Sequence, residues 1–202
     1  MEAGFQAGRP RDPGMEARVY GAAVRIFAEH GWAGFNFAAV AREARVGRSA
    51  LYRRWETPAE LAIAAIESHI VAPESIDTGS FRGDLIRLAS SMIVSYAGQA
   101  GLAPLRLFTE TNGGPENLRA LQRRISETRV RAAKAAVERG IARGEVDGSI
   151  DVQVVVDMIG GAIISHVLLT PRSRWAKTRR IAESHAARII DTLLVGIAQT
   201  NR

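Results

Sequence analysis

Cationic and hydroxyl side chains crowd into the segment from residue 42 to residue 54. The segment holds five arginines against a single glutamate, a local net charge of +4, together with Ser49 and Tyr52. Guanidinium and hydroxyl groups bind phosphate oxygens and donate hydrogen bonds to the edges of DNA bases. Nucleic-acid binding is therefore one interpretation of this segment, and a charged but merely solvated helix face is the other.

The helical pattern around these residues favours the first interpretation. Residues 35–55 have the pattern of two short helices joined by a tight turn, in which Asn36 caps the first helix and the second buries Leu51 and Trp55. A helix-turn-helix of this kind places its second helix in the major groove of DNA. The helices predicted for this part of the chain span about 15–30, 37–44, 47–55 and 58–70. The inward face of the second consists of Phe37, Val40, Ala41 and Ala44. Thr57 is predicted to cap the fourth, and Asp151 a later helix that ends at Leu169.

The composition is that of a soluble, folded protein without disulfide bonds. Of the 202 residues, 47% are apolar and 24% are charged, which suits a globule rather than a disordered chain. The chain has no cysteine, which excludes disulfides, thiolate zinc sites and a cysteine nucleophile, and a cytoplasmic location is expected. No signal peptide is predicted. The longest apolar run, residues 154–169, is broken by polar residues and glycines, so neither a membrane span nor membrane binding is predicted.

The chain is predicted to be all-α, with about nine helices and no strand-like alternation. We expect three parts: a flexible arm at 1–13, a helix-turn-helix DNA-binding domain at 14–70, and an effector-binding and dimerisation domain at 71–202. The arm carries Arg9 and Arg11. These two arginines either reach into a DNA minor groove or have no role.

No catalytic or metal-binding pattern is found in the sequence. The four histidines have no metal-ligand spacing. A glycine-rich phosphate loop, a G-x-S-x-G elbow and a carboxylate pair beside a histidine are all missing. We therefore expect no catalytic residue, no metal and no cofactor, and the protein is predicted not to be an enzyme.

Taken together, these motifs resemble the tetracycline-repressor (TetR) family of transcriptional regulators. The resemblance covers about residues 15–66 and rests on AAVRIFAEHGWAGFNFAAVAREARV, GRSALYRRW and TPAELA, which follow one another in the family's order. It implies a three-helix helix-turn-helix domain followed by a helical regulatory and dimerisation domain. The carboxy-terminal two thirds of the chain is similar to the family in its layout only.

The resemblance implies a role for each matched residue of the DNA surface. Tyr52 matches a tyrosine whose hydroxyl holds a phosphate, and Arg48 and Ser49 lie where base edges are usually met. Asn36 matches a capping residue that often contacts phosphate. Arg53 and Arg54 match positions that contact phosphate in some members of the family and a base in others.

Three positions depart from the family pattern. The turn position that is normally glycine is Arg45, which must adopt a left-handed or otherwise distorted backbone at a cost of about 1 kcal/mol. Ala50 replaces a frequent threonine and Pro58 a frequent lysine, so two common phosphate contacts are missing. Charge from Arg45, from Arg48 or from the arm is expected to replace them.

The resemblance also implies a homodimer and a small-molecule effector. In the family the last two helices, here at 151–169 and about 175–198, form a four-helix interface with a second subunit. A twofold dimer presents two recognition helices one DNA turn apart, so the operator should be a pseudo-palindrome. The candidate interface residues are Val155, Ile159, Ile163, His166, His185, Ile189 and Leu193. The residues that either line a cavity for an apolar or amphipathic effector or form ordinary core are Met92, Tyr96, Leu107, Phe108 and Met158.

The sequence thus predicts a sequence-specific transcriptional regulator that binds a double-stranded DNA operator, specifically a repressor released by its effector. One alternative is an all-α ligand-binding protein or enzyme that keeps the helix-turn-helix as a structural domain. Another is a dimeric interaction module without an effector. The salt dependence of DNA affinity separates a DNA-binding regulator from the first alternative, because release of counterions from DNA gives a steep negative slope.

Overall fold

The computed structural model describes residues 14–70, 76–98, 101–110 and 115–198, and all the regular elements in these ranges are helices. This confirms the predicted all-α class. The predicted arm at 1–13 lies outside the described residues. The α-helices are α1 (Met15–His30), α2 (Phe37–Ala44), α3 (Arg48–Tyr52), α4 (Pro58–Glu67), α5 (Phe81–Tyr96), α6 (Ala103–Thr109), α7 (Glu116–Ala142), α8 (Val152–Leu169), α9 (Trp175–Arg180) and α10 (Ala182–Ala198).

The last predicted helix, at about 175–198, is in fact two helices, so the described ranges hold ten α-helices rather than about nine. A single 3-10 turn (η1, Arg172–Arg174) precedes α9, and Ile181 leaves the helical conformation with φ −103° and ψ 15°. The indole N–H of Trp175 donates to the carbonyl oxygen of Thr170 at 3.0 Å, which ties the start of α9 to the end of α8. After the break at Ile181, α10 packs along α5.

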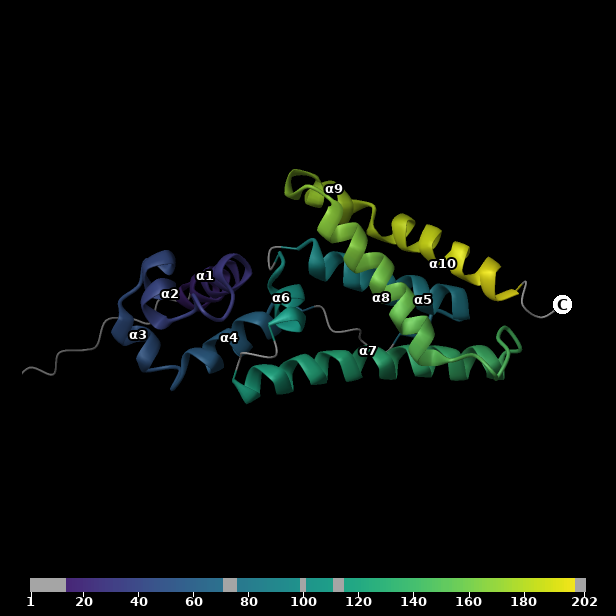
Figure 1. Cartoon of the computed structure of the whole chain (residues 1–202), viewed down its shortest axis with the longest axis horizontal. Helices are drawn as coiled ribbons and strands as arrows, with labels where there is room; N and C mark the ends of the chain where they lie inside the picture. The colour runs from purple at the N-terminus through teal and green to yellow at the C-terminus, as the bar shows by residue number, and fades with distance from the viewer. Residues whose placement is uncertain (1–13, 71–75, 99–100, 111–114, 199–202) are drawn as a thin grey trace, which may run out of the picture.

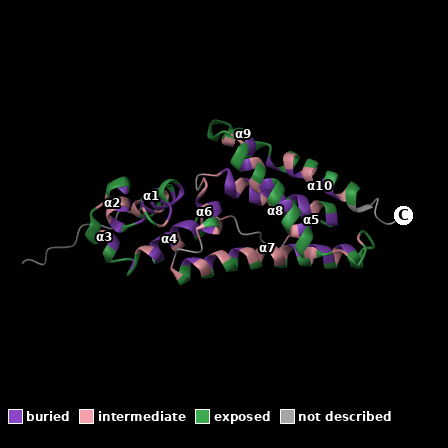
Figure 2. Cartoon of the chain, viewed as in Figure 1, coloured by how far each residue is buried: buried purple, intermediate pink, exposed green. Residues whose placement is uncertain are grey.

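The molecule is elongated, with α1–α3 gathered at one end and the end of α10 at the other (Figure 1). The helix α4 leads from the first end into the body, where it contacts α7. The helix α8 crosses the body and contacts both α5 and α7. In Figure 2, α3 at one end of the molecule and α8 and α10 in the other half all carry exposed residues.

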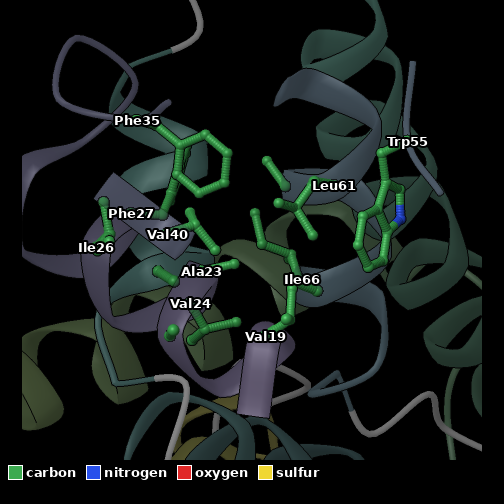
Figure 3. Packing of buried hydrophobic residues seen from close by; sticks show 14 of the residues in the cluster. Val19, Ala23, Val24, Ile26, Phe27, Phe35, Val40, Trp55, Leu61 and Ile66 are labelled. Atoms are coloured by element: carbon green, nitrogen blue, oxygen red, sulfur yellow. The ribbon is translucent and has the colours of Figure 1, made fainter. Parts of the chain in front are cut away.

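Two hydrophobic cores hold these helices together. The first joins α1–α4; in Figure 3, Phe27 and Phe35 lie together on one side of it and Trp55 on the other. This core continues into α6 and the first turns of α7 through Leu107 and Leu118. Full burial of a side chain of this size contributes about 1.5–3 kcal/mol. The helix α6 is therefore part of the same packing unit as the helix-turn-helix.

The second core lies between α5, α7, α8 and α10 and includes Tyr96 and Ile190, which are fully buried. One side of α8 is buried in this core. Among the described residues, α8 is also the one helix long and apolar enough, by length and composition, to cross a membrane. The polar breaks of residues 154–169 did not lead us to expect this. It is weak evidence for a membrane span, because core helices of soluble proteins can have the same composition.

Side-chain caps predicted from the sequence fix the starts of three helices. Asn36, Thr57 and Asp151 each accept a hydrogen bond of 2.9–3.2 Å from a backbone amide in the first turn of α2, α4 and α8. A cap of this kind is worth about 1 kcal/mol. The ends of α3 and α4 were predicted less well, since each helix stops three residues earlier than expected, at Tyr52 and Glu67.

Arg45, in the turn of the helix-turn-helix, has a left-handed backbone with φ 55° and ψ 47°, as predicted. No other non-glycine residue in the described ranges has a positive φ. The amide of Arg45 donates to the carbonyl of Arg42 at 3.3 Å, and the amide of Val46 donates to that of Ala41 at 3.0 Å. These bonds close α2 and turn the chain toward α3.

We expect Arg45→Gly to raise the free energy of unfolding by up to about 1 kcal/mol, because glycine adopts this backbone without a Cβ clash. Urea unfolding followed by circular dichroism measures the change. Arg42→Gly is the matched control, since it lies within α2, where glycine costs about 1 kcal/mol. Equal destabilisation by the two substitutions would show that the turn is not strained.

Candidate nucleic-acid interface

The short helix α3 and the turn after it direct two side chains into the first core. Leu51 is fully buried, and Trp55 is 8% exposed with its ring centroid 5.9 Å from that of Tyr20. The amides of Arg54 and Trp55 both donate to the carbonyl of Leu51, at 2.9 and 3.0 Å, so the chain tightens here and α3 ends early. The prediction that Trp55 anchors the segment to the core is confirmed.

Tyr52 lies on the opposite, solvent side of α3 and is 63% exposed. Its ring meets that of Phe37 edge-on, with centroids 4.8 Å apart and planes at 71°. Because Phe37 is itself buried in the first core, this contact orients the tyrosine ring at the surface. A phenol on an oriented ring is thus available at the end of the molecule that carries the helix-turn-helix (Figure 1).

The surface of this segment keeps its positive charge. Within the described part of the chain, no carboxylate forms an ion pair with the exposed side chains of Arg45, Arg48 and Arg53. Glu43, the one acid of the segment, lies 3.0 Å from Nη2 of Arg25 in α1. Since Arg25 engages Glu43, the three arginines remain available to an external anion.

Arg54 differs from these three arginines because an ion pair already holds it. Its Nη1 lies 3.0 Å from Oε2 of Glu16 in α1. The pair ties the end of α3 to the start of α1. A contact between Arg54 and DNA would have to share or break this ion pair, which the sequence did not indicate.

Asn36 and Ser49 are exposed near the amino-terminal ends of α2 and α3. The Oδ1 atom of Asn36 accepts a hydrogen bond from the amide of Ala39 at 2.9 Å, so the carbonyl group of this side chain serves as the cap. Its NH₂ group is left to donate elsewhere. Backbone amides at the first turn of a helix favour anions, which makes both positions suitable for phosphate.

Four of the five residues predicted either to line an effector cavity or to form ordinary core are divided between the two cores. Met92 and Tyr96 belong to the second core, whereas Leu107 and Phe108 pack in the first. Tyr96 and Phe108 nevertheless meet at one side chain that the sequence analysis missed. The guanidinium carbon of Arg129 in α7 lies 5.0 Å from the ring centroid of Tyr96 and 5.6 Å from that of Phe108.

Three α8 residues that were predicted to face a second subunit face inward instead. Val155, Ile159 and Ile163 are at most 2% exposed and lie in the second core of their own chain. Met158, which was predicted either to line an effector cavity or to form ordinary core, is 52% exposed. The sequence could not distinguish the two sides, because apolar residues surround α8. The exposed large apolar residues of α8 are Val154, Met158, Leu168 and Leu169.

A groove of about 810 Å³ separates α8 from α10 on this outer side. Its lining is mostly apolar and includes three apolar residues of the predicted interface, Ile159, Ile189 and Leu193. His185 also lines the groove, and its ring centroid lies 3.9 Å from that of His166 in α8. The structure therefore brings together five of the seven predicted interface residues.

His185 has a perturbed electrostatic environment. Partial burial, followed by the proximity of His166 and Arg188, holds the pKa of His185 below its ordinary value. The Nη2 atom of Arg188 lies 2.9 Å from Nδ1 of His185. Within the described ranges, no three histidine or acidic side chains gather into a group that could hold a metal ion.

Glu110, directly after α6, contacts the turn that follows α1 and was not predicted to matter. Its Oε2 accepts a hydrogen bond from the amide of Trp32 at 2.7 Å, and its Oε1 accepts one from Arg106 at 3.2 Å. Gly31 has φ 64°, and any Cβ there would overlap the Glu110 carboxylate. No local sequence signal reveals this contact, because its partners are 78 residues apart.

Two family models match the chain. One, described as bacterial regulatory proteins of the tetR family, matches residues 19–65, which include α2 and α3. The other, described as the tetracyclin repressor-like C-terminal domain, matches residues 75–193. Together they cover the helix-turn-helix and most of the remaining helices.

Named relatives and solved structures point the same way. The HTH-type transcriptional regulator AqdR of Rhodococcus erythropolis is 34% identical over 166 residues, which are 82% of this chain and 79% of the relative. The DNA-binding transcriptional repressor TetR of Mycobacteroides abscessus is 28% identical over 158 residues, 75% of this chain and 80% of the relative. The structure of FadR from Bacillus subtilis in complex with stearoyl-CoA shares the fold, with a TM-score of 0.65 at 20% identity over 90% of this chain and 98% of that one. The chain belongs to the TetR family of helix-turn-helix transcriptional regulators.

Proposed function

We propose that the protein binds a pseudo-palindromic DNA operator as a homodimer and represses transcription until a small molecule releases it. Membership of the TetR family supports a DNA-binding regulator, a class of protein that is generally not enzymatic. We assign the DNA surface from one observation: α3 has a buried side with Leu51 and an exposed side with Arg48 and Tyr52. Because this function requires access to bacterial DNA, we place the protein in the cytoplasm.

We assign base contacts to Arg48 and Ser49, because the first turn of a recognition helix is the part that meets base edges. An arginine side chain can pair with two acceptors of one guanine. We assign phosphate contacts to Tyr52 and Arg53, on the last turn of α3, and to Arg45 in the turn before it. Asn36 would donate to phosphate from its amide group. Arg54 positions α3 through Glu16 and contacts DNA only secondarily.

We assign the dimer interface to the outer side of α8 and α10 rather than to the predicted inner residues. This side carries exposed Met158 and Leu168 and the largely apolar groove between the two helices. Exposed apolar patches of this kind are uncommon on monomers and mark interaction surfaces. A twofold axis through this surface would pair α8 and α10 with the same helices of a second subunit. A homodimer accounts for the exposed apolar side of α8 without a membrane.

The switch that we propose runs through α6. We keep the boundary between a DNA-binding domain at 14–70 and a regulatory domain at 71–202, although α6 packs in the core of the first. A small apolar or amphipathic effector beside α6 would shift this helix, and Glu110 would pass the shift to Trp32. A coupling free energy of about 1–3 kcal/mol is enough for regulation. The stearoyl-CoA in the FadR structure supports an amphipathic effector in such a fold.

We expect Arg48→Ala to weaken operator binding by about 1–3 kcal/mol and to relax the base preference at one position of each half-site. Tyr52→Phe should weaken binding to all sequences alike, because it removes a phosphate contact that carries no sequence information. Fluorescence anisotropy with an operator selected from genomic fragments, and with a scrambled duplex, measures both effects.

Arg131→Ala is the matched control for these variants, since Arg131 is an exposed arginine of α7 and should leave DNA affinity unchanged. For the unmodified protein, affinity should fall steeply as salt rises. Affinity that does not depend on salt would favour the alternative of an all-α ligand-binding protein or enzyme. Unchanged operator binding in both α3 variants would disprove the residue roles.

We expect Met158→Asp to weaken dimerisation by at least about tenfold, because burial of a carboxylate in a largely apolar interface is costly. Sedimentation velocity across a concentration series measures the dimer fraction. Ile141→Asp is the matched control, since Ile141 is a 41% exposed apolar residue on α7, away from the groove. A stable Met158→Asp dimer would place the interface elsewhere.

We expect the protein to lose stability as the pH falls below about 6.5. The neutral form of His185 is favoured in the folded protein, so the unfolded chain binds more protons in this range and unfolding becomes easier. Stability is fully present above the ordinary pKa and is lost as the pH falls toward the lowered one. Unfolding midpoints measured from pH 8 to pH 5 test this.

His185→Gln should flatten the part of the pH profile that this histidine causes. His30→Gln is the control, because the side chain of His30 is 62% exposed in α1. If the two variants have the same profile, the environment of His185 does not contribute to the pH dependence.

A further inference from the structure

Arg129 occupies a position on the buried stripe of α7. It comes four residues after Ile125 and four before Ala133, both of which are buried. Helical spacing therefore points its side chain inward. There the guanidinium lies over the rings of Tyr96 and Phe108, at the junction of the two hydrophobic cores. The other buried residues of this stripe are Leu118, Leu121, Ala136, Val137 and Gly140.

Arg129 is also the exception among the charged residues of α7. Its Nη1 donates to the hydroxyl of Tyr96 at 2.5 Å, and in the described ranges it has no carboxylate partner and no second acceptor. A guanidinium has five N–H donors, so most of its capacity is not used by these residues. The cations of α7 that do have a carboxylate partner are Arg119, Arg123, Arg124, Arg131, Lys134 and Arg139.

A buried hydroxyl group without a partner lies at the same level of the structure. Ser95 is 3% exposed, and its Oγ has no hydrogen-bond partner among the described residues. Asp84, three helical turns earlier on the same stripe of α5, binds Arg139 of α7 at 2.8 Å. The helices α5 and α7 are antiparallel. Ser95 lies eleven residues after Asp84 on α5, and Arg129 lies ten residues before Arg139 on α7, so both are displaced from the Asp84–Arg139 pair in the same direction by a similar length. The two unsatisfied groups therefore lie at one level of the α5–α7 contact.

We propose that Arg129 binds the anionic group of the effector, a carboxylate on an apolar body, and that Ser95 is a second donor to it. The proposal rests on the effector-regulated function proposed above. A guanidinium can bind a carboxylate through two parallel hydrogen bonds, which are about twice as strong as neutral ones. The buried hydroxyl of Ser95 has no partner, and the half-buried guanidinium of Arg129 has one neutral acceptor. A buried polar group without a partner is costly, and one carboxylate would accept hydrogen bonds from both side chains. The apolar body would pack against buried side chains of this region such as Met92 and Leu107.

Binding at Arg129 also reaches the DNA-binding end of the molecule. Arg129 lies over Phe108, and Glu110, two residues further on, binds the amide of Trp32. Phe108 belongs to α6. A carboxylate that moves the guanidinium away from its ring would therefore remove a contact between α6 and α7. The anion site is thus connected by direct contacts to the turn between α1 and α2.

The test measures carboxylate binding to the full-length protein by calorimetry. The probes are octanoate, dodecanoate, hexadecanoate and cinnamate, each compared with its primary amide and with inorganic phosphate. We expect at least one carboxylate to bind about tenfold or more tightly than its amide and than phosphate. Arg129→Met should lose this preference, Arg129→Lys should keep part of it, and Ser95→Ala should weaken carboxylate binding several-fold.

Arg123→Met is the matched control, because Arg123 is an arginine of the same helix that pairs with Glu116 at the surface. It should bind the carboxylates like the unmodified protein. If Arg129→Met does not fold, the double variant Arg129→Met, Tyr96→Phe replaces it. The second substitution removes the tyrosine hydroxyl that would otherwise lose its hydrogen-bond donor. The proposal is overturned if no carboxylate is preferred over its amide, if phosphate binds as tightly, or if removing Arg129 leaves the preference intact.

Operator binding without any probe separates this proposal from the function on which it rests. The unmodified protein and Arg123→Met should bind the operator alike, because Arg123 pairs with Glu116 at the surface of α7. Operator binding without an Arg129-dependent carboxylate preference would disprove the anion site alone. Loss of specific DNA binding by the unmodified protein would disprove the proposed function itself.

Discussion

The packing of α6 into the core of the helix-turn-helix is the constraint on which the rest of the structure depends. Leu107 shares that core with side chains from α1 to α4, and Glu110 receives the backbone amide of Trp32. Residues of the regulatory part thus complete the DNA-binding end of the molecule. A change in the position of α6 cannot leave the turn after α1 undisturbed, because the core is close-packed and the carboxylate fills the space beside Gly31.

Some arginines of the described chain form ion pairs with carboxylates, and others have no carboxylate partner. Most arginines of α7 pair with a carboxylate, and Asp84, although burial opposes its ionisation, is kept charged by hydrogen bonds from Thr78 and Arg139 that lower its pKa. Two places without such pairs bear on the proposed function. One is the exposed side of the segment around α3, where Glu43 is drawn away by Arg25. The other is Arg129, between two aromatic rings. Arginines without an anionic partner in both places are what a protein needs to meet phosphate at one site and a carboxylate at another.

The two apolar sides of α8 serve different purposes. Its inner side, with Ile159 and Ile163, closes the second core of the single chain. Its outer side exposes Met158 and faces the groove beside α10. The helix α8 is apolar enough, by composition, to cross a membrane. A helix that packs in its own core on one side and against a second subunit on the other would need apolar residues on both sides, which explains this composition. A monomer would leave that surface in water, at a cost proportional to its area.

The sequence by itself determined the features that depend on near neighbours along the chain. The caps of α2, α4 and α8, the left-handed backbone of Arg45 and the inward face of α2 all follow from residue types within one or two helical turns, and all were predicted. Only the tertiary structure decided which side of α8 is internal, because apolar residues on all sides of a helix carry no direction. It also decided that Arg54 is held by Glu16, that Glu110 binds the turn after α1, and that Arg129 meets two rings. The partners are far apart in the sequence: 38 positions for Arg54 and Glu16, 78 for Glu110 and Trp32, and 33 for Arg129 and Tyr96. No local pattern can therefore encode these contacts.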